Sequence, residues 1–178
     1  MTVNTKAFER VLAWLDKGAP HEEARGMSFE MRSFIRVPVT SSTDENWCGT
    51  ACCIAGAALT LNDTPKLLDA VKIATKWLKE WNWDEFDLNS GLSLWDDAKD
   101  LLGLTNKEAS MLFAPWEQGS EEIDSYNQEI DVGCWPEDPD EITPAWAAAT
   151  IRYFLATGSI RWDVTNPAYA VEGVSEDV

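Results

Sequence analysis

The sequence lacks the signals that place a protein in or across a membrane. No hydrophobic run approaches the roughly 20 residues of a transmembrane helix, and the first residues do not follow the basic-then-apolar pattern of a secretion signal. The four cysteines are unevenly spaced, and two of them, Cys52 and Cys53, are adjacent, which is not typical of a disulfide framework. We therefore expect a cytoplasmic protein with reduced thiols and no membrane partner.

Motifs of several enzyme classes are also missing. The chain has no glycine-rich phosphate loop, no dinucleotide-binding fingerprint and no Ser-His-Asp arrangement. A structural zinc ion needs four ligands, and no two cysteines are separated by two residues as they are in common zinc sites. The available ligands would be Cys48, Cys52, Cys53, Cys134 and His21. We expect neither a metal nor a cofactor.

Basic residues are scarce. Fourteen lysines and arginines stand against 31 acidic residues, so the formal net charge is −17 and the sequence pI is about 4.2. Residues 1–36 carry six basic and five acidic groups, a net +1, and the rest carries eight against 26, a net −18. Such a field repels nucleic-acid phosphates and anionic membranes and favours basic proteins or cations. Direct nucleic-acid binding is therefore not expected, although solubility or adaptation to a salty cytoplasm explains the acidity equally well.

Apolar residues recur at helical spacing through most of the chain. At 178 residues, 45% of them hydrophobic, the chain is long enough to form one domain with a sizeable core. We expect a mainly α, single compact domain of about six helices over residues 1–171, and a loose acidic tail at 172–178. A minor β element, either one strand or a short hairpin, is predicted around residues 28–37. The predicted helices cover residues 5–17, 48–61, 64–81, 93–102, 105–113 and 143–158.

Local start and stop signals delimit these helices. Thr105 and Glu108 have the spacing of a capping box. Thr143 is followed by a proline, and a capping residue before a proline at the first helical position indicates the start of a helix. Gly103 and Gly158 are placed where helices end. The tryptophan on the last of these helices, Trp146, lies on its apolar stripe and is expected in the core.

The stretch Trp47–Leu59 holds three of the four cysteines among small apolar residues. We predict that a helix begins here at Cys48, where unpaired backbone N–H groups and the positive end of the helix dipole favour a thiolate. Cys52 would lie one turn further on the same face. One interpretation is a tightly packed central helix, because cysteine is among the most buried residue types. The other is a pocket for a small molecule or nucleotide at this helix N-terminus, formed by Cys48, Gly49, Thr50 and Cys52.

A cysteine nucleophile needs a base within hydrogen-bond reach, usually a histidine. Cys48 and His21 are the one Cys–His pair available near the predicted helix start, because His21 is the only histidine. The order along the chain is the reverse of papain-like enzymes, in which the histidine follows the cysteine. If the protein is an enzyme, Cys48 and His21 are the expected catalytic residues. A solvated histidine beside Glu22 and Glu23 is the structural alternative, and the balance favours a protein that is not an enzyme.

Residues 117–141 contain ten acidic groups and no lysine or arginine. Their prolines and glycines argue against regular structure, whereas their aromatic residues favour an ordered excursion over a loose tail. A wide aromatic side chain among charged neighbours suits a binding surface, although it can equally anchor the loop to the body. The predicted partner-binding residues are Trp116, Trp135, Glu137, Asp138, Asp140 and Glu141.

The run Cys48-Gly49-Thr50-Ala51-Cys52-Cys53-Ile54-Ala55-Gly56 resembles the Cys-Gly-Thr-x-x-Cys-Ile-Ala-Gly signature of a group of small, uncharacterised proteins from bacteriophages and bacteria. Four other segments resemble that group's pattern in the same order: Phe29–Met31, Ala98–Thr105, Ala109–Phe113 and Thr143–Gly158. Cys52, Cys134 and the acidic excursion fall outside the pattern. The resemblance implies a phage or bacterial setting, with the bacterial host cytoplasm as location, and no mechanism.

These features favour a non-enzymatic intracellular interaction protein that presents an acidic surface to a basic host protein. One version would mimic nucleic acid and so inhibit a basic DNA- or RNA-binding protein. The two alternatives are the ligand pocket at Cys48-Gly49-Thr50 and the cysteine enzyme that uses Cys48 and His21.

Overall fold

The structure is a computed structural model, and it describes residues 2–20, 27–31, 35–38, 50–64, 76, 80, 85–87, 94–115, 136 and 138–166. These residues are mainly helical, which confirms the predicted fold class. The predicted helix over 64–81 lies outside them apart from Thr64, Lys76 and Glu80, and the predicted tail at 172–178 lies outside them entirely. The α-helices are α1 (Thr5–Leu15), α2 (Ile54–Leu61), α4 (Leu94–Leu102), α5 (Asn106–Phe113), α7 (Pro144–Thr157) and α8 (Trp162–Thr165).

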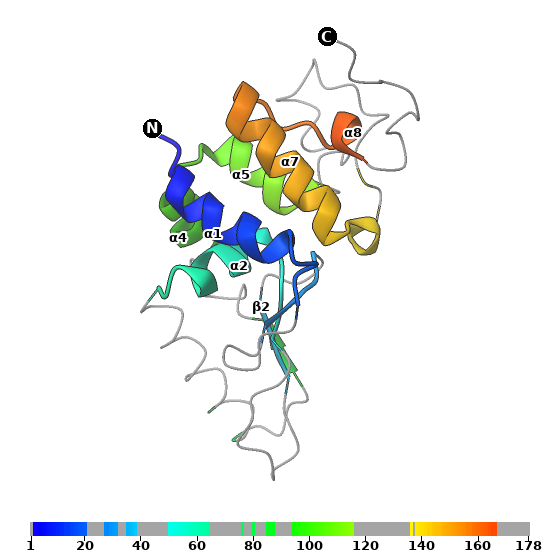
Figure 1. Ribbon diagram of the computed structural model, residues 1–178. Coiled ribbons are helices and arrows are strands. Elements are labelled where there is room, and N and C mark those ends of the chain that lie inside the picture. Colours follow the sequence, from blue (N-terminus) through cyan, green and yellow to red (C-terminus); the bar gives the residue numbers. More distant parts are fainter. Residues whose placement is uncertain are drawn as a thin grey trace, which may run out of the picture.

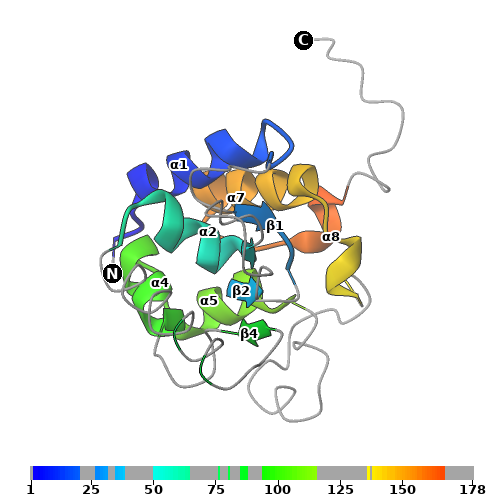
Figure 2. The same ribbon diagram turned by 90° about the horizontal axis from the view of Figure 1, so that it is seen from below.

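Helices α1, α4 and α5 all contact α2, and α1 also contacts α7. Figure 2 shows α2 between α1 and the α4–α5 pair. Phe8 of α1 and Phe154 of α7 meet edge to face with their ring centroids 6.0 Å apart, which joins the α1–α7 pair through the core.

Helix α2 is buried nearly all round because its sequence is apolar on every face. Every residue from Ile54 to Leu59 is buried. Ala55, Gly56, Ala57 and Ala58 carry at most a methyl group, so neighbouring backbones can approach closely. This is the tightly packed central helix that the small residues of the stretch predicted.

A four-stranded sheet lies beside α2, and the six helices named above are gathered on one side of it (Figure 1). Its strands, in the order β1-β3-β2-β4, are β1 (Met27–Phe29), β3 (Thr50–Cys52), β2 (Ile35–Pro38) and β4 (Glu85–Asp87). Strand β1 pairs parallel with β3, while β2 pairs antiparallel with both β3 and β4. Strands β1 and β2 therefore do not form a hairpin with each other, because β3 lies between them.

The predicted start of the central helix at Cys48 is wrong. Residues Thr50–Cys52 form strand β3, and α2 begins only at Ile54 with Cys53 as its N-cap. Pairing with two flanking strands satisfies the backbone of Thr50–Cys52, and this tertiary pairing overrides a weak local preference for helix. Cys52 is therefore not on a helix face, and the predicted i, i+4 relation between Cys48 and Cys52 does not exist.

The helix signals in the second half of the chain are confirmed. Thr105 Oγ1 accepts a hydrogen bond from the Glu108 N–H at 3.2 Å, and Glu108 Oε2 accepts from the Thr105 N–H at 2.7 Å, which completes the capping box of α5. Thr143 caps α7 by accepting from the Trp146 N–H, and Gly158 ends it with a φ of 74°. These boundaries were predictable because each depends on residues within one turn of the helix end.

The segment before α1 is tied to the end of α4. The Asn4 N–H donates to the Leu102 carbonyl and the Asn4 side-chain amide donates to the Leu101 carbonyl, each at 2.9 Å. Asn4 Oδ1 also caps α1 by accepting from the Ala7 N–H. One side chain thus satisfies a donor at the start of α1 and an acceptor at the end of α4.

Candidate functional site

Of the residues predicted for a cysteine site, the structure describes Thr50 and Cys52. Thr50 and Cys52 belong to strand β3, so neither stands at a helix N-terminus. The N-cap position of α2 is occupied by Cys53, which is only 2% exposed and makes no side-chain cap hydrogen bond. The premise of an anion pocket at a helix N-terminus formed by Cys48, Gly49 and Thr50 is therefore wrong. Outside the described residues lie Cys48, Gly49 and His21 of this site, and Trp116, Trp135 and Glu137 of the predicted partner-binding set.

Three of the predicted partner-binding carboxylates are described, and they lie together on one short turn. The 3₁₀ turn η3 covers Pro139–Glu141 and has Asp138 as its N-cap. The side chains of Asp138, Asp140 and Glu141 are all exposed. We call residues 138–141 the acidic turn. The sequence predicted the exposure of these residues but not the 3₁₀ geometry, although a proline at the first position, here Pro139, is compatible with a helical turn.

The backbone of the acidic turn is fixed by local hydrogen bonds. Asp138 Oδ1 accepts from the Asp140 N–H at 2.9 Å, and the Asp138 carbonyl accepts from the Glu141 N–H at 3.1 Å. Buried residues flank the turn on both sides, Pro136 before it and Ile142 after it. The carboxylates are therefore displayed from an ordered backbone that is anchored to the core.

The acidic turn also lies directly before the N-terminus of α7, where the helix dipole is positive. Acidic groups near a helix N-terminus stabilise it by roughly 0.3–1 kcal/mol at exposed positions. Asp140 and Glu141 precede the N-cap Thr143 by three and two residues. A structural contribution to α7 is thus the alternative to partner binding for these two carboxylates.

An open recess of about 370 Å³ lies between the C-terminal end of α1 and the first turn of α7. An ion pair between Arg152 of α7 and Asp16 of the α1 C-cap lines it and links the two helices. Both side chains are about half exposed, so the pair contributes little to stability, of order 0–1 kcal/mol. The other lining residues are Leu15, Gly18, Thr143, Pro144, Ala145 and Ala148.

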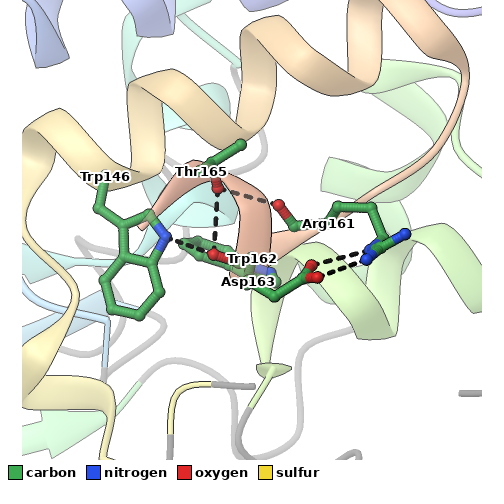
Figure 3. Close-up of polar contacts among 5 residues, drawn as sticks. All are labelled: Trp146, Arg161, Trp162, Asp163 and Thr165. Atoms are coloured by element: carbon green, nitrogen blue, oxygen red, sulfur yellow. Dashed lines mark hydrogen bonds and ion pairs between the residues drawn. The ribbon is translucent and has the colours of Figure 1, made fainter. Parts of the chain in front are cut away.

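The chain after α7 is held by a cluster of polar contacts around α8, shown in Figure 3. Trp146 Nε1 donates to the Trp162 carbonyl at 2.9 Å, and the two indole rings meet edge to face. Trp162 Nε1 donates in turn to the Met111 carbonyl of α5 at 2.8 Å. Thr150 is fully buried, and its hydroxyl is hydrogen-bonded to the Thr165 hydroxyl at 2.6 Å. These contacts attach α8 to both α5 and α7.

Sequence patterns did not single out this cluster. Its contacts join residues 15 to 51 positions apart, which no local period reveals. The predicted core position of Trp146 is confirmed, because its side chain is 5% exposed. The indole N–H groups of Trp146 and Trp162 and the hydroxyls of Thr150 and Thr165 all have hydrogen-bond partners within the fold.

An ion pair in this cluster predicts a small pH dependence of stability. Arg161 donates to both carboxylate oxygens of Asp163, and this bonding lowers the pKa of Asp163 below its ordinary value of 3.8, against the opposing effect of burial. A lowered folded-state pKa contributes stability that is present above the unfolded pKa and is lost as the pH falls through the folded one. Asp163→Asn should therefore lower the free energy of unfolding at pH 7, by less than about 1 kcal/mol because Arg161 is half exposed.

Urea unfolding of both proteins between pH 7 and pH 2.5 measures this difference. We expect the difference to shrink as the pH falls from about 3.8 through the lower pKa of the native carboxylate, because over this range the unfolded state binds a proton that the native state does not. A difference that stays constant over this range would show that the charge of Asp163 is irrelevant and only its shape matters.

In the part of the chain that the structure describes, no group of three or more histidine, cysteine or acidic side chains is placed to hold a metal ion. None of its helices has both the length and the apolar character needed to cross a membrane. The acidic turn is therefore the one predicted binding element of which several side chains can be placed.

Comparison with known proteins gives no assignment: no protein-family model, curated protein or solved structure matches this chain.

Proposed function

We propose that the protein is a non-enzymatic interaction protein that presents an acidic surface to a basic protein partner. The observation that carries the proposal is the acidic turn, in which three exposed carboxylates project from a hydrogen-bonded backbone. A net charge of −17 supports it, because a field of that sign raises the rate of encounter with a cationic surface.

A finer form of the proposal is that the protein acts as a nucleic-acid mimic. Carboxylates held on an ordered backbone can take the place of phosphates in a basic DNA- or RNA-binding site and so block it. The resemblance of Cys48–Gly56 to a signature of bacteriophage and bacterial proteins supports a phage-encoded inhibitor that acts on a host protein in the bacterial cytoplasm.

The proposal is tested with a fluorescein-labelled decalysine peptide as the basic probe. Asp140→Lys combined with Glu141→Lys removes two carboxylates from the acidic turn and leaves Asp138, whose side chain holds the turn. We expect the affinity for the peptide at low salt to fall about tenfold, because two attractive contacts become repulsive. Fluorescence anisotropy measures the dissociation constant. Unlabelled duplex DNA, added as a competitor for the peptide, tests whether the protein and nucleic acid bind the same basic probe.

A charge-matched control separates the turn from the overall field. Glu9→Lys combined with Asp100→Lys changes two exposed carboxylates on α1 and α4. Each pair of changes adds four charges and takes the formal net charge from −17 to −13. The proposal predicts a loss of less than about threefold for the control, since only long-range, screened interactions change. Equal losses in the two variants would show that the acidic turn has no binding role of its own.

A further inference from the structure

No further inference is drawn: the strongest candidate, the open recess between the C-terminal end of α1 and the first turn of α7, rests on a helix N-terminus whose neighbouring cation, Arg152, is already paired with Asp16, and nothing in the described part of the chain points to a ligand there.

Discussion

Replacing Trp162 with alanine is expected to lower the free energy of unfolding by about 3–5 kcal/mol, the usual cost of emptying a large aromatic site in a core. Trp162 is fully buried, and its ring packs edge to face on Trp146 with centroids 5.7 Å apart. Its Nε1 also donates to the Met111 carbonyl, which loses this partner in the variant. Because α8 has only four residues, the loss of this side chain should release the helix from α5.

Two control variants on the same helix make this result interpretable. Trp162→Phe keeps most of the buried ring and loses the hydrogen bond to Met111, so it should cost about 1–3 kcal/mol. Val164→Ala should stay within about 0.5 kcal/mol of the wild type, because Val164 is 54% exposed. Urea denaturation followed by circular dichroism measures all three. A cost below about 1 kcal/mol for Trp162→Ala would mean that α8 is not docked as described.

Gly103→Ala is expected to destabilise the protein by about 2–4 kcal/mol, as the sum of backbone strain and overpacking. Gly103 follows α4 with a φ of +70°, a conformation that residues with a Cβ adopt at a cost. A Cβ at this position would stand 2.3 Å from the Thr2 carbonyl oxygen. Since backbone cannot swing aside as a flexible side chain can, the segment held by Asn4 must move away from the end of α4.

Gly158→Ala is the matched control for this substitution. Gly158 ends α7 with a φ of +74°, almost the same conformation, but a Cβ there would meet nothing within 4 Å. Only the backbone strain remains, of about 1 kcal/mol. Thermal unfolding of the two variants therefore isolates the contact with Thr2. Equal decreases in stability would contradict the close approach of the N-terminal segment to α4.

Helices with strong local signals were predictable from the sequence, and the reason is the short range of those signals. The Thr105–Glu108 capping box and the Thr143-Pro144 start each fix a helix end through residues within one turn. The small residues of α2 correctly predicted dense packing, because side chains no larger than a methyl group let neighbouring backbones approach closely.

The sheet and the true start of α2 were not predictable because they depend on distant partners. Strand β3 pairs with β1 and β2, which lie more than ten residues earlier in the chain. Thr50–Cys52 is too short to show a strand period, so the local pattern read as the first turn of a helix. The helix N-terminus predicted at Cys48 and the i, i+4 relation of Cys48 and Cys52 depended on that start, and both are wrong.

The candidate site was predictable in its charge but not in its geometry. A run of acidic residues with prolines indicates exposure, and Asp138, Asp140 and Glu141 are exposed. The hydrogen bond that orders the turn, from the Asp140 N–H to the Asp138 side chain, depends on one backbone conformation that the composition does not specify.

Amide hydrogen exchange of the wild-type protein, with and without a saturating amount of decalysine peptide, tests the proposed binding role most directly. We expect slower exchange within residues 138–142 when the peptide is bound, because the contacts stabilise the hydrogen-bonded form of the acidic turn, and unchanged exchange in α4 and α5. Unchanged exchange in the acidic turn, or the same small change throughout the chain, would contradict a local acidic binding element and leave only the nonspecific field of a highly charged protein.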